Sequence, residues 1–161
     1  MRRILATFTL AAAYAATVAP AGAAADPLDF LAGRWHCAHT VGDFSGTYVE
    51  RFERTLRGRW LRQTYEFPAT GDQPEARAEY FIGFDPRVSR VVRFGAHDNG
   101  MYFAMRTTSL TDTTMVFEYV LPGPGATATW TKHGGREYTI DGPSYPQNGR
   151  TVTEHHDCRK A

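Results

Sequence analysis

Two short clusters near the ends of the sequence hold residue types that bind metals or form disulfides. The first is His36-Cys37-Ala38-His39 and the second is His155-His156-Asp157-Cys158. The chain has two cysteines, one in each cluster. Imidazoles and thiolates bind transition metals, whereas paired cysteines in an exported protein form disulfides. Which chemistry applies depends on the compartment of the protein and on the elements that bring the clusters together.

The first 25 residues have the pattern of a secretory signal peptide. The basic pair Arg2-Arg3 precedes an apolar run, and Ala23-Ala24-Ala25 supplies an Ala-x-Ala cleavage site. We therefore expect residues 1–25 to be removed and residues 26–161 to form one domain in the periplasm or the medium. No cysteine follows the cleavage site directly to accept a lipid, so we expect a soluble protein without integral membrane association.

The composition argues against several classes of partner. The sequence carries 18 Lys and Arg residues against 17 Asp and Glu residues, so it is near neutral and has no electrostatic preference for nucleic acid. Aromatic residues make up 13% of the chain, which excludes a disordered protein.

After one helical signal, the sequence reads as short β-strands. Asp26-Pro27 opens a helical turn that Gly33 ends. Ten runs rich in Thr, Val, Tyr, Phe and Trp follow, separated by turn signals such as Asn99-Gly100 and Asp141-Gly142-Pro143. The predicted strands are 34–41, 46–56, 59–67, 77–84, 89–96, 101–108, 114–121, 126–132, 136–141 and 150–158. They predict an all-β fold, an antiparallel up-and-down β-barrel of 8 to 10 strands, because closure removes the exposed sheet edges. A two-sheet sandwich is the alternative.

Barrel closure would place the two clusters side by side. With an even number of strands, the first and last are antiparallel neighbours, and a disulfide between Cys37 and Cys158 is the simplest pairing. His39 would then lie opposite His156, and Glu154 would share their face of the sheet. This trio is a candidate site for a transition metal or for an axial ligand to haem. The alternative is a pair of structural histidines beside a disulfide. We expect no other cofactor.

Alternation along the strands predicts which side chains point inward. Tyr hydroxyls, an amide and a carboxyl among apolar residues are typical of a small-molecule cavity, although some of these residues must simply fill the core. The candidate cavity residues are Trp35, Tyr48, Glu50, Phe52, Gln63, Tyr65, Tyr80, Phe117 and Tyr119. Arginines between Arg51 and Arg62 could contact an anion or a polysaccharide, but Glu50, Glu53 and Glu66 offset their charge, which predicts an ion-paired outer face on that hairpin.

Several motifs together resemble a known family. Gly33-Arg34-Trp35, with Arg159 and Lys160 near the end, is similar to the lipocalin and calycin signature, in which a basic side chain covers the tryptophan. With Phe81-Ile82-Gly83-Phe84-Asp85-Pro86, the chain looks like bacterial exported lipocalin-like domains of unknown function that are related to nitrobindins. The resemblance implies a barrel with an internal cavity. Nitrobindins bind haem through a histidine, but Cys37 and His39 stand here at two glycine positions of their motif.

The sequence thus predicts a monomeric exported barrel that binds a small apolar or amphipathic molecule. Two alternatives stay open: a haem- or metal-binding barrel, and a structural or interaction module with a filled interior. Neither Gly-x-Ser-x-Gly nor His-Glu-x-x-His occurs, so the sequence does not predict hydrolytic catalysis.

Overall fold

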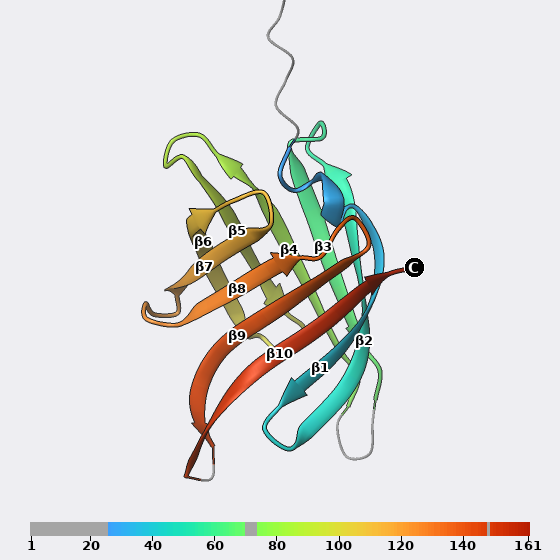
Figure 1. Cartoon of the computed structure of the whole chain (residues 1–161), viewed down its shortest axis with the longest axis vertical. Coiled ribbons are helices and arrows are strands. Elements are labelled where there is room, and N and C mark those ends of the chain that lie inside the picture. Colours follow the sequence, from blue (N-terminus) through green and yellow to red (C-terminus); the bar gives the residue numbers. More distant parts are fainter. Residues whose placement is uncertain (1–25, 70–73, 148) are drawn as a thin grey trace, which may run out of the picture.

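The chain forms one closed antiparallel β-barrel of ten strands (Figure 1). A computed structural model describes residues 26–69, 74–147 and 149–161; the predicted signal peptide, residues 1–25, lies outside this part. The strands are β1 (Gly33–Val41), β2 (Phe44–Thr55), β3 (Trp60–Phe67), β4 (Ala76–Asp85), β5 (Arg90–His97), β6 (Tyr102–Leu110), β7 (Thr114–Leu121), β8 (Thr127–Lys132), β9 (Glu137–Gln147) and β10 (Arg150–Lys160). Successive strands are neighbours, and β1 pairs with β10 to close the sheet. The predicted up-and-down barrel is confirmed.

The register between β1 and β10 is also as predicted. Cys37 lies opposite Cys158 and the two form a disulfide across a sequence separation of 121 residues. His39 lies opposite His156, and Val41 lies opposite Glu154. One face of this strand pair therefore gathers both histidines, the glutamate and the disulfide.

Strand β9 is longer than predicted. The predicted turn at Asp141-Gly142-Pro143 is wrong, because the strand continues to Gln147. Gly142 and Pro143 together face Glu154, between the pairs Asp141↔His155 and Ser144↔Thr153. This two-against-one arrangement is a β-bulge, where a proline without an N–H is tolerated. A Cβ on Gly142 would come within 2.8 Å of the Glu154 Cβ, so a glycine lets the two strands approach here.

A short 3₁₀ turn, η1 (Asp29–Leu31), covers one end of the barrel. It corresponds to the predicted helical turn, and the Asp26 carboxylate accepts a hydrogen bond from the Leu28 N–H. Leu31 is buried, and its carbonyl accepts a 2.7 Å hydrogen bond from the Trp35 indole N–H. The Lys160 ammonium lies 5.3 Å from the centre of the Trp35 ring. Trp35 and the turn thereby close this end of the barrel with apolar side chains.

Candidate functional site

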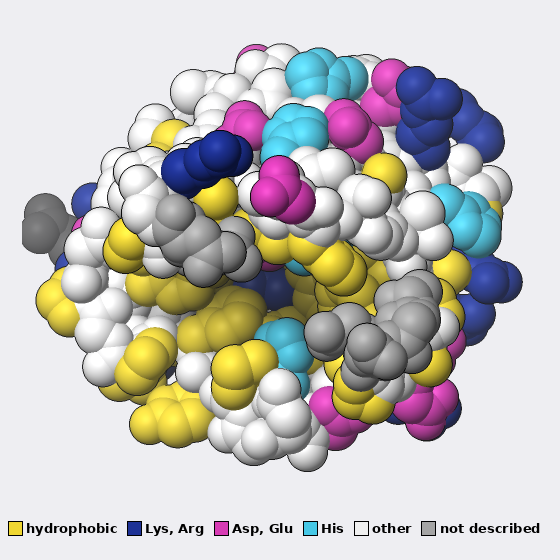
Figure 2. Space-filling model, turned by 90° about the horizontal axis from the view of Figure 1, so that it is seen from below, with side chains coloured by type: hydrophobic (Ala, Val, Ile, Leu, Met, Phe, Trp, Pro, Cys, Tyr) yellow, Lys and Arg dark blue, Asp and Glu magenta, His cyan; other side chains and the backbone are white. Residues whose placement is uncertain are grey.

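The opposite end of the barrel opens into an interior cavity of about 530 Å³. This is the lower end in Figure 1, where β9 turns into β10 and β1 into β2. Figure 2 looks in from this side and shows a hollow walled by hydrophobic side chains, with a basic side chain deep inside. The lining residues are Tyr65, Phe67, Tyr80, Arg93, His97, Gly100, Met101, Tyr102, Phe103, Met105, Tyr119, Pro122, Ala128, Trp130, Ile140, Gly142, Glu154 and His156.

Arg93 is the basic side chain among these lining residues. It lies on β5 opposite Ile82 on β4 and Met105 on β6, whose side chains are both buried in the barrel. Arg93 is itself only 4% exposed. Its Nε donates a 2.8 Å hydrogen bond to the Gln63 side-chain oxygen, and one terminal nitrogen donates a 2.9 Å bond to the Tyr65 hydroxyl. These oxygens are neutral, so they hold the guanidinium without neutralising its charge.

Aromatic rings surround the same guanidinium. Its central carbon lies 3.9 Å from the ring centre of Tyr80, 4.9 Å from that of Phe103 and 5.5 Å from that of Trp130. Ring faces stabilise a cation through their quadrupole, most strongly where water is excluded. The arginine is therefore held in place by packing as well as by hydrogen bonds.

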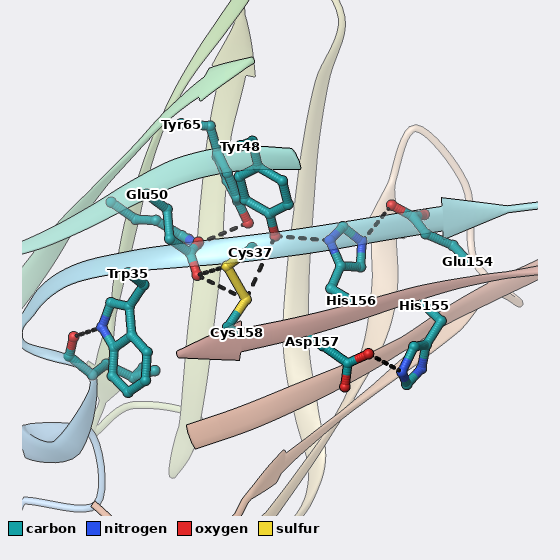
Figure 3. The surroundings of a disulfide bond; sticks show 12 residues. Trp35, Cys37, Tyr48, Glu50, Tyr65, Glu154, His155, His156, Asp157 and Cys158 are labelled. Atoms are coloured by element: carbon teal, nitrogen blue, oxygen red, sulfur yellow. Dashed lines mark hydrogen bonds and ion pairs between the residues drawn. A yellow bond between two sulfur atoms is a disulfide. The ribbon is translucent and has the colours of Figure 1, made fainter. Parts of the chain in front are cut away.

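Glu50 is the acidic residue of this buried network, and its burial favours the neutral form. Burial raises the pKa of its carboxyl to about 8, although the Gln63 hydrogen bond, the Arg93 charge and Tyr65 act to lower it. The Gln63 amide donates a 2.7 Å bond to Oε2 of Glu50. Oε1 lies 3.4 Å from Sγ of Cys37. Figure 3 shows the Glu50 carboxyl beside the disulfide. A neutral Glu50 does not balance the charge of Arg93, and the ionised carboxylate on the cavity wall is that of Glu154.

A second polar group lies on the wall formed by β1 and β10. Nε2 of His156 is 2.8 Å from Oε1 of Glu154, and Nε2 of His39 is 3.4 Å from the same oxygen. The two imidazole rings stack with their centres 4.5 Å apart. On the other side of its ring, His156 Nδ1 is 2.7 Å from the Tyr48 hydroxyl (Figure 3).

The ionisation of this group follows from these contacts. Burial alone would raise the pKa of Glu154, but the hydrogen bond with His156 and the contact with His39 outweigh it and hold that pKa well below its usual range. Burial lowers the pKa of His156, opposed by the nearby Glu154 carboxylate. At neutral pH an ionised carboxylate thus faces two imidazoles.

A third histidine lies across the cavity. His97 is hydrogen-bonded through Nε2 to the Tyr80 hydroxyl. Burial lowers the pKa of His97, and the charge of Arg93 lowers it further. A neutral imidazole therefore borders the cationic end of the cavity.

The structure divides the predicted cavity residues into two groups. Tyr65, Tyr80 and Tyr119 line the cavity. The others are buried but do not reach it: Trp35, Phe52 and Phe117 pack in the core, and Tyr48, Glu50 and Gln63 form the polar layer behind the lining. The metal candidates His39 and His156 come together with Glu154 as their register required.

Sequence reasoning missed Arg93, the central residue of the site. A signal for it was present, because the turn at Asp85-Pro86 aligns β4 with β5 and places Arg93 opposite the inward-facing Ile82. The alternation alone gives no sign that an arginine between Val92 and Phe94 is buried. The prediction that Glu50 balances the outer arginines is wrong, since Glu50 is fully buried. Glu53 and the N-terminal aspartates instead pair with the outer arginines, in Arg51–Glu53, Arg62–Glu53, Arg54–Asp26 and Arg54–Asp29.

No family model and no curated protein matches the chain. A solved structure of a redesigned β-barrel is similar, with 11% sequence identity, a TM-score of 0.48, and coverage of 84% of this chain and 96% of that chain. In the part of the chain that the structure describes, no helix is long and apolar enough to cross a membrane.

Proposed function

We propose that this barrel binds a small molecule with an apolar body and one anionic group, and that Arg93 is the anchor for that group. The observation that carries the proposal is the buried guanidinium in the cavity wall, whose hydrogen-bond partners are neutral. A charge removed from water is costly unless it is paired. A carboxylate, sulfonate or similar group would pair it.

The rest of the cavity suits the body of such a ligand. Small-molecule sites in proteins occupy roughly 300–1,000 Å³ and are mostly apolar with a few placed polar groups. This cavity has about 530 Å³ and is lined by aromatic and aliphatic side chains such as Phe103, Met105 and Trp130. A cavity of this size and lining supports a binding protein rather than a structural barrel whose interior is filled by its own side chains.

Two features support a lipocalin-like, exported protein as part of this proposal. Lys160 covers Trp35 next to Gly33, the arrangement that the lipocalin resemblance implies. A disulfide between the first and last strands is typical of proteins that fold in an oxidising compartment.

A pair of fluorescent probes tests the proposal. Anilinonaphthalene sulfonate and N-phenylnaphthylamine share the same aromatic body, but only the first carries an anion. We expect the native protein to bind the sulfonate more tightly. Arg93→Met should weaken sulfonate binding by about tenfold or more, since a hydrogen bond to a charged group contributes about 1.5–3 kcal/mol. Binding of the neutral probe should be unchanged.

Two further variants keep the test interpretable. Arg62→Met removes an exposed arginine and should leave both affinities unchanged. Arg93→Lys retains the charge and should keep part of the preference for the sulfonate, even if Arg93→Met folds poorly. Equal binding of the two probes by the native protein, or sulfonate binding that Arg93→Met does not alter, would refute the proposal.

A further inference from the structure

We propose that His39, Glu154 and His156 form a binding site for a divalent transition-metal ion, with zinc as the ion that their chemistry fits best. The site is independent of Arg93 and of the proposed anionic ligand. It rests on the geometry of three side chains that converge from two paired strands.

The donor atoms already lie close to the spacing that a metal requires. One ligand atom from each of the three residues lies within 4.8 Å of the other two. Ligands about 2.0–2.2 Å from a tetrahedral zinc ion are separated from one another by roughly 3.3–3.6 Å. The Glu154 carboxylate oxygen is 2.8 Å from His156 Nε2 and 3.4 Å from His39 Nε2. Small side-chain rotations would therefore admit the ion.

His39 has an unmet bonding requirement that a metal would satisfy. Both of its ring nitrogens are shielded from solvent, and neither has a hydrogen-bond partner among the described residues. A buried polar group without a partner destabilises a fold. Coordination through Nε2 would use the nitrogen that faces Glu154.

His156 is oriented as a metal ligand. Its Nδ1 lies 2.7 Å from the Tyr48 hydroxyl, a buried group that can accept a hydrogen bond from Nδ1–H. In the metal-free protein Nε2 donates its proton to the Glu154 carboxylate. Metal binding would therefore move the ring proton to Nδ1, which then donates to Tyr48, and free the Nε2 lone pair for the ion. Metal-bound histidines commonly donate their second ring N–H to such a partner.

The backbone holds the three ligands on rigid elements. His39 and His156 are a directly opposed pair on β1 and β10. Glu154 faces the β9 bulge at Gly142 and Pro143, and bulges often direct side chains at functional sites. Cys37 and Cys158 also lie near Glu50, but their sulfurs are joined in the disulfide and supply no thiolate ligand.

Two imidazoles and one carboxylate favour zinc and leave a coordination position open. Zinc sites with three protein ligands bind water or another molecule at the fourth position. Glu154 and His156 line the cavity, so that position would face its interior. A metal here would thus border the same space as the anionic ligand without depending on it.

Titration of the metal-free full chain with zinc, measured by calorimetry on protein without a histidine tag, tests the proposal. We expect one ion per chain. His39→Ala and Glu154→Gln should each weaken binding by more than about 100-fold, since even the loss of an outer-shell partner weakens binding 10–100-fold. His39→Ala loses the 3.4 Å contact between Nε2 and Glu154 but no hydrogen bond, so the variant should fold. Cobalt added in place of zinc should show the visible bands of a four-coordinate ion.

His155→Ala is the matched control. His155 adjoins His156 in sequence but points outward, where it contacts Asp141 and Asp157 (Figure 3). This variant should bind zinc like the native protein. Absence of stoichiometric zinc binding, or binding that His39→Ala leaves intact, would overturn the proposal. A haemin Soret band that depends on His156, in a protein that does not bind zinc, would also overturn it and make these histidines haem ligands.

Discussion

Oε1 of Glu50 lies 3.4 Å from Sγ of Cys37 and 3.6 Å from Sγ of Cys158 inside the barrel. A disulfide sulfur carries no proton, so only a protonated Glu50 can make a hydrogen bond here, with the sulfur as a weak acceptor. Burial raises the pKa of Glu50 to about 8, so the carboxyl can supply that proton below this pH. The contact also connects the disulfide that closes the barrel with the hydrogen bonds from Glu50 through Gln63 to Arg93.

Glu50→Gln should change how stability depends on pH. The folded-state pKa of about 8 lies above the ordinary value of 4.5, so folding favours the neutral carboxyl. Its contribution is fully present below about pH 4.5 and is lost as the pH rises to about 8, with a total on the order of a few kcal/mol. Urea unfolding at several pH values should show the native protein losing stability relative to Glu50→Gln across this range. A constant difference would mean that Glu50 is ionised in the fold.

The affinity for an anionic probe should also decrease as the pH rises through about 8. Ionised Glu50 would compensate Arg93 through Gln63 and weaken its attraction for the sulfonate probe. Fluorescence titrations should show this decrease in the native protein but not in Glu50→Gln. The neutral probe serves as the control and should bind equally at each pH. A decrease that persists in Glu50→Gln would assign the effect to another group.

Reduction of the disulfide should destabilise the barrel strongly. The bridge closes a loop with a sequence separation of 121 residues. In the chain-entropy model a loop of this length contributes about 4–5 kcal/mol, and strain reduces that figure. Urea unfolding with and without dithiothreitol measures the effect, and a Cys37→Ala/Cys158→Ala double variant should not respond to the reductant. A loss below about 1 kcal/mol would show that strand pairing alone closes the sheet.

Tyr48→Phe should weaken zinc binding by about 10–100-fold while leaving the three ligands in place. The change removes the hydroxyl that positions Nδ1 of His156. Tyr138→Phe is the matched control, because the Tyr138 hydroxyl is buried and has no hydrogen-bond partner among the described residues. Calorimetry measures the zinc affinity of both variants. Equal affinities in the two would show that Tyr48 does not orient the histidine.

Local sequence determined the strands, their order and the closing pair. Residues alternate between the two faces of a strand, and turn residues interrupt the chain, so both signals lie within a few neighbouring positions. Two cysteines at opposite ends then set the register of β1 against β10, which brought His39 opposite His156.

Only the tertiary structure decided which charged residues are buried and where the cavity lies. Arg93 and Arg51 are the same residue type on β-strands, yet one is enclosed by the Tyr80, Phe103 and Trp130 rings and the other pairs with Glu53 on the outer face. Burial of a charge depends on side chains that several distant strands bring together, and short-range patterns do not contain that information. Short-range patterns also failed at β9. Gly142-Pro143 has the sequence of a turn, but in the barrel these residues form a bulge opposite Glu154 on the neighbouring strand.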